Sequence, residues 1–231
     1  MTRNILDRKL HLLMEEVLLI ESMVETATLE AIEALKNHDV VSARRICNED
    51  ALINARRFKI ENDVMITIAT EQPIMAHDLR LVASIYEVVA ELERMGDYAK
   101  GIARICIHIG ETPHIKPLYD IPKMANLAVE MLQKAVIAFV NSDADTARQI
   151  PKGDDEVDRL YNQVYRELVG IMSRDPSTID QANLLLWVAH NLERMSDRVT
   201  NICERTIYIA TGELKELDIS DDEEKFSGEE K

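Results

Sequence analysis

Apolar side chains recur at steps of three and four residues along almost the whole chain. One such stripe runs from Leu10 to Leu35 and another from Val82 to Ile109. This spacing brings apolar residues back to the same face of an α-helix at every turn. The 231 residues include only 7 Gly and 6 Pro, too few to punctuate the many short strands of a sandwich or barrel. The sequence therefore predicts an all-α protein of long helices.

The breaks between these helices are marked by capping and breaking residues. Asp39 is a good N-cap for a predicted helix over 40–70, which ends near Gln72-Pro73. The next helix is expected to begin near Asp78. The densest group of breakers follows it and consists of Gly110, Pro113, Pro117 and Pro122. We therefore place the boundary between two halves of the chain there.

The second half of the chain repeats the first. Residues 37–54 match residues 141–158 at 6 of 18 positions, where unrelated sequences would match at about one. Residues 92–109 match residues 192–209 at 8 of 18 positions. The sequence therefore predicts a tandem duplication with three helices in each copy.

We predict a first three-helix repeat over 1–112, a second over 118–217, and a disordered acidic tail over 218–231. A helix of roughly 30 residues is about 45 Å long. Two such bundles placed in series would form an elongated rod.

The charge balance and the cysteines limit the classes of function. The formal net charge is −15, which repels nucleic acids unless a basic patch exists, and attracts metal cations. Three cysteines, Cys47, Cys106 and Cys203, lie in apolar runs and are typical of reduced core thiols in a cytosolic protein. No apolar run approaches the ~20 residues that span a bilayer. We expect a cytoplasmic protein that does not bind nucleic acid.

An acidic motif occurs in both copies. Glu93 and Asp97 stand at helix positions i and i+4, and Glu193 and Asp197 repeat them. Like charges at this spacing repel, but together they can hold one hard cation. With acids at 42 of 231 positions, chance alone gives about seven such pairs. The duplicated context, rather than the spacing, makes this motif a candidate metal site.

The helix before each motif carries a second acidic element. Asp154 and Asp158 form this pair in the second copy, and Asp50 and Asn54 hold the equivalent positions. Antiparallel neighbours would bring these residues toward the Glu-x-x-x-Asp motifs. For Asp50 or Asp154 taken singly, the favoured alternative is an acid near a helix N-terminus. For the repeated set, the favoured interpretation is metal binding.

Three segments carry a resemblance to a known family: Asn191–Ile202, Thr211-Gly212-Glu213, and Gln72-Pro73 with Asp78-Leu79-Arg80. In these segments the chain resembles the PhoU family. The resemblance extends to about residue 217. It implies two three-helix bundles, a homodimer, and a cytoplasmic protein that catalyses no reaction.

The resemblance also implies partners and a cofactor. The partners would be the ATPase subunit of a high-affinity phosphate ABC transporter and a sensor histidine kinase, with membrane contact only through them. The function would be negative regulation of the phosphate-starvation response. The cofactor would be a multinuclear metal, iron first, with manganese, magnesium or zinc as alternatives. The implied metal site consists of Asp50, Asn54, Glu93, Asp97, Asp154, Asp158, Glu193 and Asp197.

Two departures and one alternative accompany this prediction. Asn54 stands where the second copy has an acid, and Gly101 stands where it has Asn201, so we expect the first copy to bind metal more weakly. A ferritin-like, carboxylate-bridged oxidase or hydrolase is the alternative function, although histidines are missing from the motifs. Glu111 and His114 have its Glu-x-x-His spacing, but Pro113 lies between them.

Overall fold

The computed structural model describes residues 2–217, and the predicted acidic tail over 218–231 lies outside this range. Three helices form the first repeat: α1 (Thr2–Asn37), α2 (Val40–Thr70) and α3 (Ala76–Ile109). The second repeat contains α4 (Asp120–Val140), a short α5 (Ala144–Ala147), α6 (Asp154–Arg174) and α7 (Ile179–Thr211), with 3-10 turns at Ile150–Gly153 and Pro176–Thr178. The described residues contain no strand, so the all-α prediction is confirmed.

The turns after α1 and α4 share one construction. Asp39 caps α2 as predicted, because its Oδ1 accepts hydrogen bonds from the backbone of Val41 at 3.1 Å and Ser42 at 3.0 Å. Asp143 caps α5 in the same way. The second repeat then departs from the first, because Pro151 lacks a backbone N–H and interrupts the helix that would match α2. One long helix of the first repeat is therefore replaced by α5, a 3-10 turn and α6.

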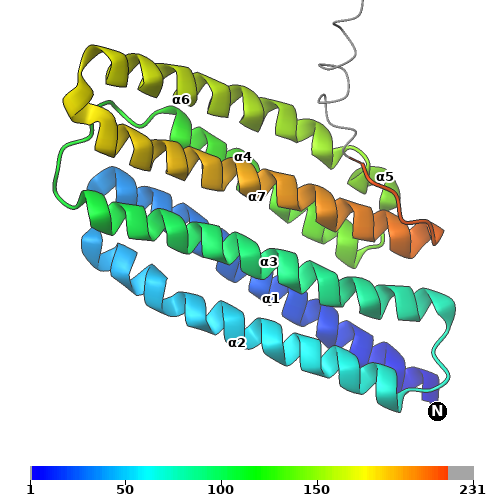
Figure 1. Cartoon of the computed structure of the whole chain (residues 1–231). Coiled ribbons are helices and arrows are strands. Elements are labelled where there is room, and N and C mark those ends of the chain that lie inside the picture. The colour runs from blue at the N-terminus through cyan, green and yellow to red at the C-terminus, as the bar shows by residue number, and fades with distance from the viewer. Residues whose placement is uncertain (1, 218–231) are drawn as a thin grey trace, which may run out of the picture.

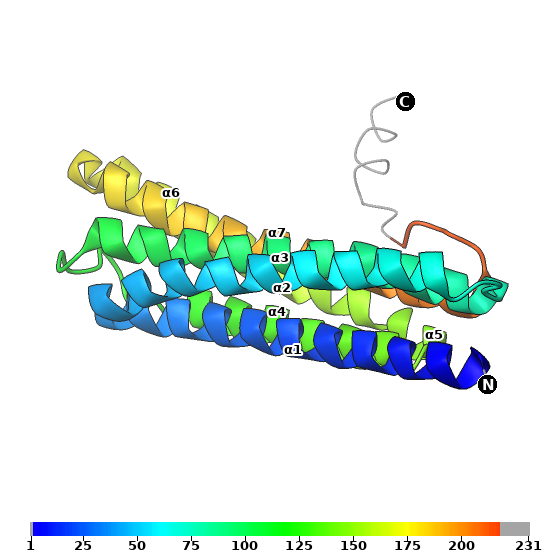
Figure 2. The same cartoon turned by 90° about the horizontal axis from the view of Figure 1, so that it is seen from below.

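The two bundles lie side by side, not in series (Figures 1 and 2). The inner helices α1 and α3 of the first repeat pack against α4 and α7 of the second, while α2 and α6 lie on the outside. The molecule is elongated along the helix axes, but the prediction of a serial rod is wrong. The repeats lie side by side because α3 and α7 are apolar on the face toward each other as well as on the face toward their own bundle. One continuous core therefore joins both repeats.

Polar contacts fix the antiparallel register of α3 and α7. Arg198 Nη1 donates to Glu91 Oε2 at 3.0 Å, and Arg198 Nε donates to the Tyr98 hydroxyl at 3.2 Å. Asn191 lies opposite Gly101, where a Cβ would be only 3.0 Å from Asn191 Nδ2. Gly101 therefore allows the two helices to approach closely.

The segments that carry the family resemblance meet at one end of this pair. Arg80 donates from Nε and Nη2 to the carbonyl oxygen of Ile209, at 3.3 and 3.1 Å. Gly212 ends α7 with a positive φ of 79° and lies beside the Arg80 guanidinium. Arg80 of the first repeat thus satisfies a terminal carbonyl of the second repeat.

The loop between the repeats is held by two histidines. The rings of His38 and His114 stack with centroids 4.1 Å apart. His114 Nε2 lies 2.9 Å from the Leu35 carbonyl oxygen, so this histidine contacts the backbone of α1. The Glu111–His114 spacing is therefore not that of a ligand pair on a helix.

The core and the cysteines follow the sequence pattern. Cys106 and Cys203 are buried free thiols, as predicted, whereas Cys47 is only partly buried. In the described part of the chain, no helix is long and apolar enough to cross a membrane.

Candidate metal centre

The first-repeat acids lie on α2 and α3, at the edge of the core. Asp50 is 5% exposed and lies ten residues inside α2, so its interpretation as an N-terminal acid is wrong. Glu93 is also largely buried, whereas the Asp97 side chain is 52% exposed. Asn54 points to Asp50, and its Nδ2 donates to Asp50 Oδ2 at 3.1 Å.

Two basic side chains neutralise these first-repeat acids. Lys100 Nζ donates to Asp50 Oδ2 at 2.6 Å and lies 3.8 Å from Asp97 Oδ1. Arg57 Nη1 donates to Glu93 Oε2 at 2.9 Å, while its Nε donates to Glu61 at 2.7 Å. Basic side chains of the first repeat itself therefore balance the charge of Asp50 and Glu93. Only Asp50 Oδ1 among the atoms of these acids is buried without a hydrogen-bond partner in the described residues.

The second-repeat acids lie on α6 and α7. Asp154 is the first residue of α6, so its position near a helix N-terminus agrees with the electrostatic alternative for that residue. Glu193 is brought close to the other three carboxylates. Burial most of all, and then the charges of Asp197, Asp158 and Asp154, together raise the pKa of Glu193 to about 7, while Arg194 opposes the rise. Glu193 therefore interacts electrostatically with the other three carboxylates across α6 and α7.

The two basic residues that contact the first-repeat acids are replaced by uncharged residues at the equivalent positions of the second repeat. At the offset of 104 residues between α2 and α6, Arg57 corresponds to Tyr161. At the offset of 100 between α3 and α7, Lys100 corresponds to Thr200. Arg194 Nη1 does donate to Asp197 Oδ2, at 3.1 Å. The second-repeat acids nonetheless lack the two basic groups that contact Asp50 and Glu93 in the first repeat.

The donor chemistry of the second-repeat acids fits a hard cation. All four are carboxylates, and burial, together with the neighbouring carboxylates, disfavours the charged form of Glu193, which a bound cation would favour. Within residues 2–217, however, no three His, Cys, Asp or Glu side chains are grouped so that they could hold a metal ion as they stand. Metal binding at Asp154, Asp158, Glu193 and Asp197 therefore stays a prediction, as it does for the first-repeat acids.

The sequence analysis missed one residue beside this cluster. His190 Nδ1 lies 3.2 Å from Glu193 Oε2, and the rings of Trp187 and His190 pack at a steep angle with centroids 5.6 Å apart. The signal was present, because His190 and Glu193 are three residues apart on one helix face. The first repeat has Ala90 at the equivalent position, so the duplication gave no hint of it.

Comparison with known proteins agrees with this arrangement of two similar units. The PhoU domain family model matches residues 17–106 and again residues 121–206. A relative from Clostridium acetobutylicum, named phosphate-specific transport system accessory protein PhoU homolog, is 38% identical over 96% of this chain and 100% of its own length. A relative of the same name from Aquifex aeolicus is 36% identical over 87% of this chain and 90% of its own length.

Solved structures give the same result for the fold. The crystal structure of PhoU from Pseudomonas aeruginosa matches with a TM-score of 0.84 and 32% identity, over 90% of this chain and 99% of that one. The crystal structure of the phosphate transport system regulatory protein PhoU from Streptococcus pneumoniae matches with a TM-score of 0.84 and 31% identity, over 91% and 99%. With two matched domains and relatives similar along almost their whole length, this chain belongs to the PhoU family.

Proposed function

We propose that this chain is an accessory protein of a phosphate-specific transport system and that it regulates that system by binding other proteins. The observation that carries the proposal is similarity over essentially entire chains to relatives named for this role. The Streptococcus pneumoniae structure is described as a regulatory protein of the same system. Neither name describes an enzyme, which favours an adaptor without catalytic activity.

The finer parts of the proposal follow the family resemblance. The protein would act as a cytoplasmic homodimer on the ATPase subunit of the transporter and on a sensor histidine kinase. It would lower the phosphate-starvation response while phosphate is plentiful. Its long helices suit this role, because they offer extended surfaces to partners on both sides of the molecule (Figure 2).

We further propose that the second-repeat acids hold the metal, with iron first and manganese, magnesium or zinc as alternatives. Support comes from Glu193, whose pKa is raised first by its burial and then by the charges of Asp197, Asp158 and Asp154. A bound cation would supply positive charge at the place where the first repeat uses Arg57 and Lys100. The protein groups would bind and orient it through carboxylate oxygens.

One experiment tests both parts. Protein purified without chelator is analysed for metal content and then passed over the immobilised transporter ATPase. The double substitution Glu193→Gln with Asp197→Asn is expected to lose most of the metal, and the matched change Glu93→Gln with Asp97→Asn to lose less. Wild-type protein without metal would refute the metal proposal. Failure of the immobilised ATPase to retain the metal-containing protein would refute the adaptor proposal.

His190 favours a second candidate function, a carboxylate-bridged metal enzyme. An imidazole beside a carboxylate cluster is a feature of di-iron oxidases in helical bundles. Oxygen consumption by the iron-loaded protein would distinguish this function from an adaptor. We expect no turnover above that of free iron.

A further inference from the structure

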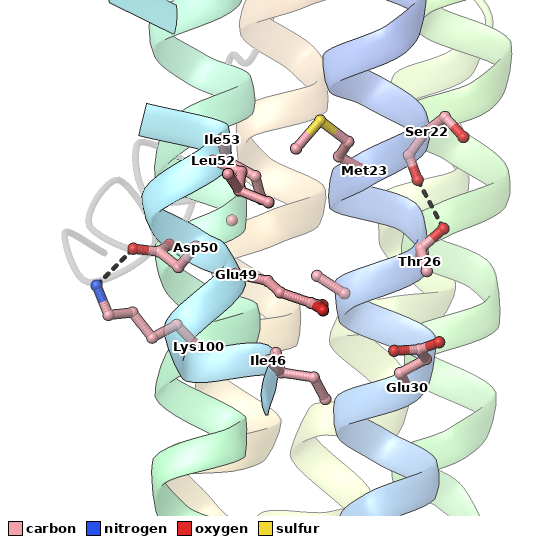
Figure 3. Close-up of a pocket in the computed structure, with 12 residues that line it drawn as sticks. Ser22, Met23, Thr26, Glu30, Ile46, Glu49, Asp50, Leu52, Ile53 and Lys100 are labelled. Atoms are coloured by element: carbon pink, nitrogen blue, oxygen red, sulfur yellow. Dashed lines mark hydrogen bonds and ion pairs between the residues drawn. The ribbon is translucent and has the colours of Figure 1, made fainter. Parts of the chain in front are cut away.

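The first repeat has a hollow between its first two helices, α1 and α2. It has a volume of about 200 Å³ and lies over Gly96 of α3. We call it the Ala27 hollow. Figure 3 shows Ser22, Met23 and Thr26 of α1 on one side of it and Ile46, Leu52 and Ile53 of α2 on the other. An engineered apolar cavity of about 150 Å³ suffices to hold benzene, so this hollow has room for a large aliphatic group.

The second repeat shows what fills this space. At the offset of 104 residues, Ala27 corresponds to Met131 of α4, and Glu49 corresponds to Gly153. Met131 is 6% exposed, and its Cγ and Sδ would lie 3.2 Å from a Cβ placed on Gly153. A methionine side chain thus occupies the second repeat at the place where Ala27 leaves the first repeat hollow. The second repeat therefore indicates which kind of side chain fits the hollow of the first repeat: a long, unbranched apolar one such as methionine.

A second hollow lies farther along the same pair of helices, and the two hollows together form a groove between α1 and α2. The second hollow lies around Leu12, Leu19 and Ile66, and we call it the Leu12 hollow. These three side chains are between 46% and 50% exposed, and Leu52 beside the Ala27 hollow is 59% exposed. The two hollows are about eleven residues apart along α1, which is about 17 Å, or three helical turns. A helix lying along the groove would therefore present apolar side chains to both hollows from one face.

The charges around the groove indicate the character of its occupant. More carboxylates than lysines line the two hollows, and the chain as a whole carries −15. Arg45 joins Glu30 and Glu49 across the Ala27 hollow at 2.7 and 3.0 Å, so these rim charges flank the opening. The lining carboxylates are Glu15, Glu16, Glu30, Glu49, Asp50 and Asp63, against Lys9, Lys59 and Lys100. Lys100 contacts Asp50, Lys59 and Arg56 contact Glu16, and Arg45 contacts Glu30 and Glu49, so the acids best placed to attract a basic partner are Glu15 and Asp63.

We propose that the α1–α2 groove of the first repeat binds an amphipathic helix of a partner protein, with aliphatic side chains on one face and basic residues along its edges. A methionine or leucine of that helix enters the Ala27 hollow as Met131 does in the second repeat. A second aliphatic side chain, three turns along, enters the Leu12 hollow. Recognition of this kind uses apolar anchors for affinity and flanking charges for orientation. It does not depend on the metal proposed above.

The test uses a labelled synthetic helical peptide with methionine or leucine at positions i, i+4, i+7 and i+11 and lysine along both edges. Binding to the full chain is measured by fluorescence anisotropy with chelator present. A peptide of the same composition in scrambled order is the control ligand. We expect saturable binding of the amphipathic peptide and at least tenfold weaker binding of the scrambled one.

The decisive variant is Ala27→Met, which fills the hollow with the side chain that the second repeat uses. It is expected to bind the peptide at least tenfold more weakly, whereas Ala51→Met, which adds the same side chain at an exposed position of α2 outside the hollow, is expected to bind like wild type. Should Ala27→Met fold poorly, Leu19→Lys at the exposed Leu12 hollow gives the second measurement and is also expected to weaken binding. Absence of saturable binding, or equal binding by wild type, Ala27→Met and Leu19→Lys, overturns the proposal.

Discussion

The two repeats place carboxylates at equivalent positions but balance their charge differently. In the first repeat, Arg57 contacts Glu93 and Lys100 contacts Asp50. In the second, Tyr161 and Thr200 stand at those positions, and the pKa of Glu193 rises to about 7. The two repeats also differ in packing. Met131 fills a space in the second repeat, and Ala27 leaves the corresponding space in the first repeat open. The two copies therefore differ both in the side chains that stand beside their acids and in whether the space beside the first helix of the repeat is open.

The difference in packing gives the largest expected effect. Met131→Ala would open in the second repeat the hollow that the first already has, and truncation of a buried methionine costs about 2–5 kcal/mol of unfolding free energy. Urea unfolding measures this cost. Ile137→Ala, at a position of α4 that is 57% exposed, is the control and should change stability by about 0.5 kcal/mol or less. A loss at Met131 no greater than the control would mean that its side chain does not fill the repeat.

The response to metal comes next. A cation bound only to the folded protein adds about 2.7 kcal/mol of stability at a hundredfold excess over its Kd. Wild-type protein should gain melting temperature with metal, and Glu193→Gln with Asp197→Asn should gain much less. In chelator, this variant should be at least as stable as wild type, because it removes repelling charges. Ready unfolding of the variant in chelator would mean that these acids are structural hydrogen-bond partners.

The pH dependence of stability separates the two clusters without metal. The folded pKa of Glu193 is about 7, above its ordinary value of 4.5, so the folded state keeps a proton that the unfolded state has released. This contribution is fully present below pH 4.5 and is lost as pH rises through 7, and its size is about 3 kcal/mol.

Glu193→Gln should remove this loss, so that the variant gains stability over wild type between pH 4.5 and 7. Glu93→Gln makes the matched change in the first repeat but deprives Arg57 of a carboxylate, so it should destabilise the protein at neutral pH. Chemical denaturation of the chelated proteins across this pH range provides the measurement. If both variants shift stability in the same direction, the proposed difference in charge balance is wrong.

The smallest expected effect is a difference in affinity between the two copies. A chelator titration should empty the Glu93/Asp97 motif before the Glu193/Asp197 motif, with an affinity difference of about tenfold, or about 1.4 kcal/mol. Replacing Arg57 with Tyr and Lys100 with Thr gives the first repeat the residues of the second. The exchanged protein should retain more metal at a given chelator concentration. Loss of metal from both motifs together, before and after the exchange, would contradict the comparison.

Features that depend on local spacing could be read from the sequence. The period of the apolar residues gave the helices, and Asp39 gave the start of α2. The internal matches gave the duplication, and the spacing of Glu193 and Asp197 gave a pair on one helix face. Pro151 was visible, but its effect was missed because the predicted helices were drawn from the first copy alone.

The sequence by itself determined the long helices, their pairing into two repeats, and the acids that each repeat carries. Only the tertiary structure decided that the repeats lie side by side, that Lys100 reaches Asp50 across 50 residues of chain, that His190 joins Glu193, and that Ala27 leaves a hollow. The physical reason is that helix formation depends on neighbours within one or two turns. Charge balance and cavities depend instead on which side chains distant helices bring together, and the packing of the whole molecule sets that.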